Sequence, residues 1–322
     1  MARIGLVLGA GGMAGVAFHA GVLSGLAEGL GWDPRDAEIV VGTSAGSLIA
    51  AGLRAGLSGP DIAARTEGVP MSAQGSALLE AADAVIGPRP DRAPPVRFRA
   101  AGPAAPGVLV AAGLQPWRVR PAAVIAGLLP AGSASTAALE SGLDALFHDR
   151  WPARPMWVCA VHLESGRLTV FGRDGAPPAR VGQAVAASCA IPGYFAPVTV
   201  AGSRYVDGGA HSLTNLSQLA RRGLDLVVVS APMSRAGRRR PLSGTLVREA
   251  ARVQLGIEAS QVRRRGTPVI AFQPTAEDQA AAGRNFMDPR RQAGIARQAR
   301  ASTLRRLERA DIKDRVALLT SS

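Results

Sequence analysis

A serine flanked by glycines near the start of the chain is the residue best suited to covalent chemistry. Gly42, Ser44 and Gly46 form a G-x-S-x-G pentapeptide between an apolar run at residues 39–41 and a helix-like run at residues 48–51. Strand, sharp turn and helix in this order are the context of a nucleophile elbow, which lifts a serine clear of a sheet. The amides that open the following helix favour negative charge beside it. The context therefore predicts a nucleophilic serine, whereas the pentapeptide alone is more typical of an ordinary turn.

A glycine-rich loop precedes this serine. Residues 4–8 form an apolar run typical of a buried strand, and apolar residues recur at helical spacing over residues 16–23. The glycines between these two segments are Gly9, Gly11, Gly12 and Gly15. Backbone amides of such a loop form a cradle for an anion. The anion could be the pyrophosphate of a dinucleotide or the oxyanion of a tetrahedral intermediate.

The second predicted strand separates these two uses of the loop. A dinucleotide site needs an acidic residue at the carboxyl end of that strand, where it binds the ribose hydroxyls. Here the strand at residues 39–41 leads directly into Gly42, and the nearby acids, Asp36 and Glu38, precede it. The sequence therefore disfavours NAD or FAD binding and favours an oxyanion hole.

A carboxylate that could activate the serine lies much later in the chain. Asp207 is followed by Gly208 and Gly209, and the segment A-S-C-A-I-P-G-Y-F-A-P-V occupies residues 187–198. An Asp-Gly dipeptide by itself marks a turn. In combination with the glycine-rich loop and the serine pentapeptide, however, the chain resembles the patatin-like phospholipase family. That family carries the same four blocks in the same order, and here they lie between about residues 4 and 215.

The resemblance implies a Ser–Asp dyad that uses no histidine. Ser44 would be the nucleophile, Asp207 the proton acceptor, and the amides of Gly11, Gly12 and Met13 the oxyanion hole. The glycines that would support these motifs are Gly9, Gly15, Gly42, Gly46, Gly208 and Gly209. A carboxylate can serve as the base when partial desolvation raises its pKa.

The implied activity is that of a serine esterase in lipid degradation. Such an enzyme cleaves carboxylic esters of phospholipids or lysophospholipids and releases a fatty acid through an acyl-Ser44 intermediate. We expect neither a metal nor a cofactor, because backbone donors would supply the electrophilic stabilisation.

One position departs from the family pattern. The family's loop commonly reads G-G-G-x-[R/K]-G, whereas Ala14 occupies the basic position here. This departure puts the substrate class in question more than the reaction type. The alternative is a catalytically impaired lipid-binding or regulatory protein at anionic membranes, against which the presence of both Ser44 and Asp207 argues.

A conventional Ser-His-Asp triad is the competing arrangement. His211 follows Asp207 closely, so the order Ser44, Asp207, His211 formally matches that of α/β-hydrolases. An acid and a histidine only a few residues apart would have to reach around each other on one loop. We therefore expect His211 to have a packing or rim role.

The composition is that of a globular enzyme with a basic C-terminal region. The chain has 322 residues, of which 47% are hydrophobic, and a net charge of +13. Cys159 and Cys189 offer neither a disulfide framework nor metal-ligand spacing, which favours a reducing, cytoplasmic location. A cleaved signal peptide would remove the glycine-rich loop, and this argues against one. No apolar run reaches the ~18 residues of a membrane span, so we expect no transmembrane helix.

Arginines dominate the positive charge and are concentrated late in the chain, at residues 238–240, 263–265 and 290–309. No nucleic-acid-binding signature accompanies them, and we expect no nucleic-acid partner. The remaining alternatives are peripheral contact with the anionic inner surface of a membrane, and an ordinary solvated helix face.

The order of the predicted elements is that of one α/β domain. We expect a mostly parallel central sheet with helices on both faces, the three-layer core that the resemblance also implies. The motifs occupy a core at residues 4–216, interrupted by a variable cap at about residues 71–135. Further strands and helices follow over residues 217–322, ending in a basic helix from about residue 290 to 319.

Overall fold

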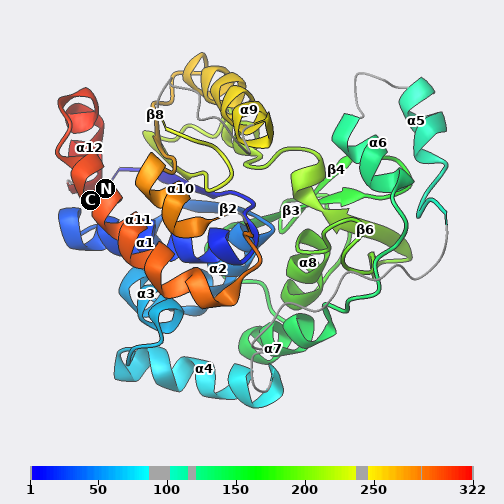
Figure 1. The fold of residues 1–322 in the computed structure, drawn as a ribbon, viewed down its shortest axis with the longest axis horizontal. Helices are drawn as coiled ribbons and strands as arrows, with labels where there is room; N and C mark the ends of the chain where they lie inside the picture. The colour runs from blue at the N-terminus through cyan, green and yellow to red at the C-terminus, as the bar shows by residue number, and fades with distance from the viewer. Residues whose placement is uncertain (1, 87–101, 115–120, 237–245, 284, 321–322) are drawn as a thin grey trace.

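A central sheet organises the molecule (Figure 1). The computed structural model describes residues 2–86, 102–114, 121–236, 246–283 and 285–320. Within these residues the sheet has eight strands, in the order β5-β6-β3-β2-β1-β7-β8, with β4 also paired to β3. The strands are β1 (Ile4–Leu8), β2 (Ile39–Thr43), β3 (Met156–His162), β4 (Leu168–Phe171), β5 (Val198–Val200), β6 (Ser203–Asp207), β7 (Leu226–Ser230) and β8 (Val269–Phe272). Pairings among β3, β2, β1, β7 and β8 are parallel, whereas β4, β5 and β6 pair in antiparallel fashion. The predicted mostly parallel α/β class is confirmed.

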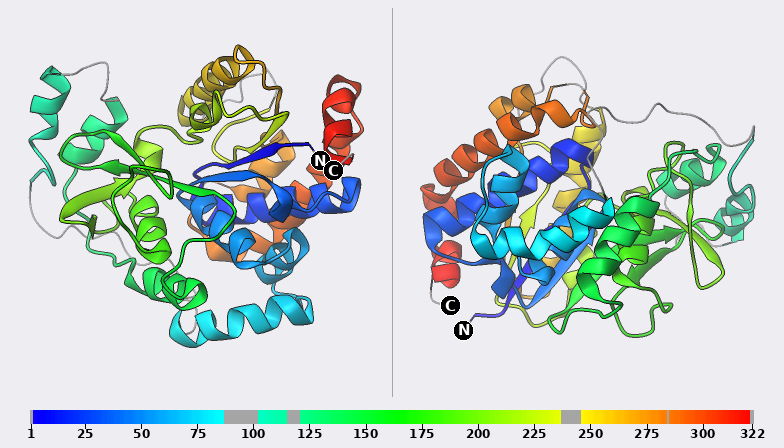
Figure 2. Two further views of the ribbon diagram at one scale, coloured as in Figure 1. Left: turned by 180° about the vertical axis from the view of Figure 1, so that it is seen from behind. Right: turned by 90° about the horizontal axis from the view of Figure 1, so that it is seen from below.

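Helices cover both faces of this sheet (Figure 2). One face packs against α1 (Gly12–Leu30), α2 (Ala45–Ala55), α3 (Gly59–Glu67), α7 (Ala137–Phe147), α8 (Val181–Ser188) and α11 (Gln292–Leu307). The other face packs against α9 (Leu246–Arg263) and, at its β3–β6 end, against α5 (Val108–Leu114) and α6 (Pro121–Leu128). The remaining elements are α4 (Ala73–Ile86), α10 (Ala276–Ala282), α12 (Lys313–Thr320) and the 3₁₀ turns η1 (Pro34–Asp36), η2 (Gly208–Ala210), η3 (Leu216–Leu219), η4 (Pro289–Arg291) and η5 (Ala310–Ile312).

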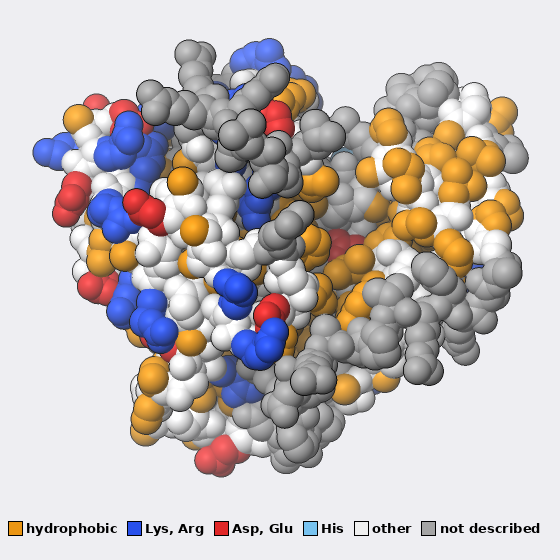
Figure 3. Space-filling view, viewed as in Figure 1, with side chains coloured by type: hydrophobic (Ala, Val, Ile, Leu, Met, Phe, Trp, Pro, Cys, Tyr) orange, Lys and Arg blue, Asp and Glu red, His pale blue; other side chains and the backbone are white. Residues whose placement is uncertain are grey.

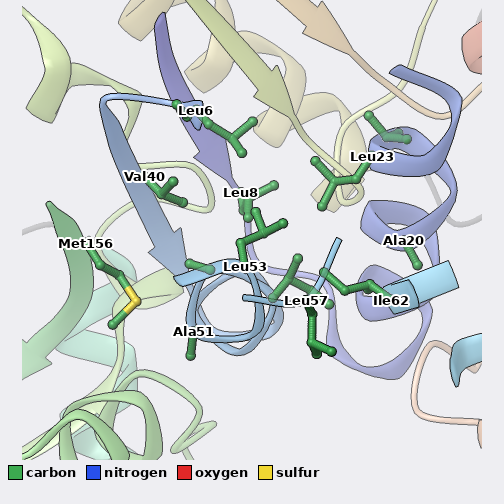
Figure 4. Close-up of a cluster of buried hydrophobic side chains, with 14 of the residues drawn as sticks. Leu6, Leu8, Ala20, Leu23, Val40, Ala51, Leu53, Leu57, Ile62 and Met156 are labelled. Carbon is green, nitrogen blue, oxygen red and sulfur yellow. The ribbon is translucent and has the colours of Figure 1, made fainter. Parts of the chain in front are cut away.

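The alternation of side chains along each strand supplies both layers of the core. Leu6, Leu8 and Val40 face the layer of α1 and α2, where they meet Leu23 and Leu53 (Figure 4). The neighbouring strand residues point to the opposite face and pack under α9. Because both faces are covered, the central strands are apolar at nearly every position rather than at alternate ones.

Helix α1 is long and apolar enough, by length and composition, to cross a membrane. In this fold, 67% of its apolar stretch is buried. It packs so closely on α11 that a Cβ atom at Gly21 would collide with the carbonyl oxygen of Ala296. The structure therefore uses α1 as a packing element of the core.

The C-terminal region differs from the single basic helix that the sequence predicts. Helix α11 ends at Leu307, and η5 separates it from α12. At this break, Asp311 accepts hydrogen bonds from Arg306 (2.8 Å) and Arg309 (3.1 Å). The predicted cap contains α4, α5 and α6, whereas its Pro/Arg connector and Trp117 lie outside the described residues.

Candidate active site

Ser44 occupies the sharp turn between β2 and α2. Its backbone angles, φ 53° and ψ −123°, are rarely adopted by a residue with a side chain and indicate local strain. The Ser44 amide donates to Oγ of Ser188 (2.9 Å), which donates in turn to the carbonyl of Cys159 (2.6 Å). The Ser47 hydroxyl donates to the Ser44 carbonyl (2.7 Å). These bonds fasten the strained turn to β3 and to the first turn of α2.

The two glycines of the pentapeptide are required by close packing. A Cβ atom at Gly42 would lie 2.5 Å from Cα of Ser47, and one at Gly46 would collide with the carbonyl of Leu8. Side chains at either position would therefore push α2 away from β1 and β2. Gly9 and Gly208 are packed as closely, against the carbonyls of Leu213 and Cys159, whereas Gly15 and Gly209 have looser contacts with Ala45 and Asp207.

The pairing of β3 with its neighbours β2 and β6 brings Asp207 close to Ser44. Thr43 of β2 pairs with Cys159 of β3, and Asp207 of β6 pairs with Ala160, the next residue of β3. Strand β4 pairs with both of these β3 residues, so β2 and β6 must share the other edge of β3. Because β2 runs parallel to β3 and β6 antiparallel, the carboxyl ends of β2 and β6 meet there.

Burial controls the chemistry of Asp207. Its side chain is 5% exposed, and its Oδ1 accepts a hydrogen bond from the Gly209 amide (2.7 Å). Burial raises the pKa of Asp207 to about 6, although hydrogen bonds from the Ser44 hydroxyl and the Gly209 amide oppose the rise. A carboxylate with a pKa near neutrality is suited to general-base work.

The glycine-rich loop presents backbone amides beside these two residues. The neighbouring amides of Ala10 and Ala14 are already used, since they donate to backbone carbonyls (2.7 and 2.9 Å). Across the described part of the chain, no protein acceptor is hydrogen-bonded to the amides of Gly11, Gly12 or Met13. Gly11 and Gly12 line the same pocket as Ser44, whereas Met13 lies outside its lining. The loop can therefore offer free donors to an anion in that pocket.

A pocket of about 280 Å³ contains both Ser44 and Asp207. Its walls are mainly apolar and include Ile125 of α6, Leu129 just after that helix, and Phe286. No histidine is among the described residues that line it. An apolar pocket with a small polar centre is suited to a ligand that is mostly hydrocarbon.

Asn215, which sequence reasoning did not single out, connects the two halves of the site. Its buried amide Nδ2 donates to Oγ1 of Thr43 (3.0 Å) and to the carbonyl of Ser212 (2.7 Å). Its Oδ1 lies 3.0 Å from Nδ1 of His211. Asn215 thus joins the residue before Ser44 to the loop after Asp207. This pairing of His211 fits the packing role expected for it.

His19 is a second residue whose importance only the structure reveals. It is fully buried, with Nε2 2.8 Å from the carbonyl of Gly9 and Nδ1 2.7 Å from Oγ of Ser230. Burial lowers the pKa of His19 to about 4, so the ring is neutral near pH 7. It therefore links Gly9, at the start of the glycine-rich loop, to Ser230 at the end of β7.

The cysteines contribute no reactive thiolate. Burial raises the pKa of both Cys159 and Cys189 to about 12, and neither forms a disulfide. Among the described residues, no group of His, Cys, Asp and Glu side chains has the arrangement of a metal site.

Residues 6–220 match the sequence profile of a family described as patatin-like phospholipase. Among solved structures, the fold is similar to VipD from Legionella pneumophila (17% identity, TM-score 0.45), covering 96% of this chain and 67% of that one. It is also similar to the type III effector protein ExoU (18% identity, TM-score 0.34), covering 94% of this chain but only 53% of that one. No curated protein matches the sequence.

Proposed function

Because the chain belongs to the patatin-like phospholipase family and is a lipid acyl hydrolase, we propose that Ser44 and Asp207 form its catalytic dyad. The observation that carries this proposal is the pairing of a strained serine with a buried carboxylate in one apolar pocket. The raised pKa of Asp207, about 6, supports its assignment as the base.

The proposed reaction proceeds in two steps. Ser44 attacks the ester carbonyl while its proton passes to Asp207, and the tetrahedral intermediate collapses to an acyl-Ser44. Asp207 returns the proton to the departing alkoxide, so the first product leaves as an alcohol. Asp207 then takes a proton from water, which attacks the acyl group, and returns that proton to Oγ of Ser44 as the fatty acid is released.

The free amides of Gly11 and Gly12 support an oxyanion hole in this reaction. They line the pocket beside Ser44, and the amide of Met13, the second residue of α1, follows them. Such preorganised donors stabilise the negative charge that develops in the transition state. We include Met13 as the third donor, although it is not among the residues that line the pocket.

We propose a phospholipid or lysophospholipid as the substrate. The apolar pocket walls favour a hydrocarbon chain, and the dyad acts on a carboxylic ester. The substitution of Ala14 for the family's usual basic residue affects none of the three proposed oxyanion amides. Its amide donates to the carbonyl of Phe286 (2.9 Å), which fixes the start of α1 without a charged side chain.

A fluorophosphonate probe tests the dyad directly, because it labels only an activated serine. We expect labelling of the wild type, loss of labelling in Ser44→Ala and Asp207→Asn, and retention in Ser165→Ala, which alters a turn outside the pocket. Circular dichroism checks that each variant is folded. Absence of labelling in the folded wild type would favour the alternative of a lipid-binding protein with an impaired site.

Contact of the basic C-terminal region with an anionic membrane and a cytoplasmic location remain predictions. Several of these arginines pair with carboxylates, including Arg290 with Asp288 (2.9 Å) and Arg305 with Glu277 (2.7 Å). Such pairs reduce the charge available to a lipid surface. Neutralising the arginines of residues 290–309 should weaken binding to anionic vesicles if this region makes the contact, and should leave it unchanged otherwise.

A further inference from the structure

We propose that the exposed apolar side chains of α5, α6 and the pocket mouth form a docking surface for a lipid aggregate. We call this the rim surface; it comprises Leu109, Leu114, Ile125, Leu128, Leu129 and Phe286. The inference rests on the proposed function, since it concerns how an aggregated substrate reaches Ser44. It differs from the basic C-terminal contact in both location and chemistry.

The rim surface is unusually open for large apolar side chains. Leu114 is 72% exposed, Ile125 60% and Leu109 53%, and the others are at least one-third exposed. Figure 3 shows apolar side chains gathered over α5 and α6, across a hollow from a part of the surface with many charged side chains. An apolar patch of this kind on an otherwise charged surface marks a binding site.

The two described segments that carry five of the six rim residues contain no charged side chain; Phe286 lies on a third segment, and Arg118 and Arg120 lie between the two, outside the described residues. Residues 102–114 and 121–139, which include α5 and α6, have no Asp, Glu, Lys, Arg or His, although the chain as a whole has a net charge of +13. Insertion into the apolar layer of a lipid surface would therefore desolvate no charge on these segments.

The rim surface is continuous with the proposed active site. Ile125, Leu129 and Phe286 line the pocket that contains Ser44, and they are also exposed to solvent. A lipid whose acyl chain leaves an aggregate at this surface would meet the apolar side chains of Ile125, Leu129 and Phe286 as it enters the pocket. The position of the surface thus provides a direct path for an insoluble substrate.

A lipid surface fits this position better than a second copy of the chain. A protein partner on the rim surface would cover the pocket mouth, whereas a lipid layer would supply the substrate through it. The arginine-rich helix α11, and α12 after it, lie at the opposite end of the molecule from α5 and α6 (Figure 1). We therefore expect binding that does not depend on anionic lipid.

The test compares two triple variants in the full-length protein. The rim variant is Leu109→Asp/Leu114→Asp/Leu128→Asp, which changes no residue of the pocket lining. The matched control is Val247→Asp/Val253→Asp/Ile257→Asp, at exposed apolar positions of α9. Both are made in a Ser44→Ala background for flotation with phosphatidylcholine vesicles, and in the active protein for rate measurements. Leu114→Asp alone replaces the rim triple if the triple does not fold.

We expect the rim variant to bind vesicles at least tenfold more weakly than the control and to hydrolyse vesicle lipid at least tenfold more slowly. Hydrolysis of a monomeric short-chain ester should be equal in both. Equal flotation of the two variants would overturn the docking inference. The inference would also be overturned if light scattering showed the control to be a dimer and the rim variant a monomer, while both bound vesicles equally. The rim surface would then be an interface between two copies of the chain. If the wild type hydrolyses no ester at all, the proposed function fails, while flotation still decides the docking inference.

Discussion

Asp207 reaches Ser44 because β6 and β2 meet end to end along one edge of β3. Their last residues, Asp207 and Thr43, stand opposite consecutive residues of that strand. The backbone hydrogen bonds of the sheet therefore set the separation of the proposed nucleophile and base. This rigid placement suits a dyad, which has no histidine to bridge a longer distance.

The activity of the dyad should depend on the ionisation of Asp207. Because the proposed base must be deprotonated, and burial raises its pKa to about 6, kcat/KM should increase with pH and level off above about pH 7. Hydrolysis of a monomeric short-chain ester between pH 4.5 and 8.5 measures this profile. A rate independent of pH over this range would contradict the assignment of Asp207 as the base.

The same carboxylate should lower the stability of the fold at neutral pH. Its pKa is higher in the folded state than the ordinary value of 3.8, so folding is favoured when Asp207 is protonated and this advantage is lost as pH increases through about 6. Asp207→Asn removes the buried charge and should increase the free energy of unfolding by up to about 3 kcal/mol at pH 8. The increase should shrink to about 0.5 kcal/mol near pH 4.

Urea unfolding of both proteins at the two pH values measures this difference. His19, whose pKa burial lowers to about 4, titrates in both proteins and cancels in the comparison. A variant less stable than the wild type at pH 8 would show that the carboxylate is stabilised by its surroundings, contrary to the raised pKa.

Two glycines of α2 should respond in opposite ways to the same substitution. Gly46→Ala places a Cβ atom against the carbonyl of Leu8 and should destabilise the fold by about 3 kcal/mol and abolish fluorophosphonate labelling. Gly52→Ala meets only an ordinary contact with Leu57 and should stabilise the helix by about 0.5–1 kcal/mol. Urea unfolding measures both. Similar stabilities of the two variants would show that α2 can move away from β1.

Asn215 should act as a positioning residue for the dyad. Its backbone has a φ of 50°, which glycine tolerates, so Asn215→Gly removes the side-chain hydrogen bonds without adding backbone strain. We expect the variant to lose about 1–3 kcal/mol of stability and to reduce kcat about tenfold with KM nearly unchanged.

Arg221→Gly is the matched control, because Arg221 is an exposed residue with a φ of 67°. It reports the effect of glycine at a positive φ away from the pocket. An Asn215→Gly variant that loses stability but keeps the kcat of this control would assign Asn215 a purely structural role.

The local structure around Ser44 could be predicted from the sequence because it depends on neighbouring residues. An apolar run, a glycine-flanked serine and a helical run specify strand, turn and helix, and the structure has β2, the strained turn and α2 in that order. The same holds for β1, the glycine-rich loop and α1. The apolar strands likewise predicted a sheet covered on both faces.

Long-range pairing decided the rest. No local pattern indicates that β6 would pair with the edge of β3 that β2 also uses, and this pairing alone brings Asp207 to Ser44. Burial of Asp207 and the links made by Asn215 and His19 depend in turn on that arrangement. The charge of the C-terminal arginines was evident in the sequence, but their carboxylate partners were not, because several lie on other elements. Local propensity thus determined the elements, whereas the relation between distant strands determined the proposed site.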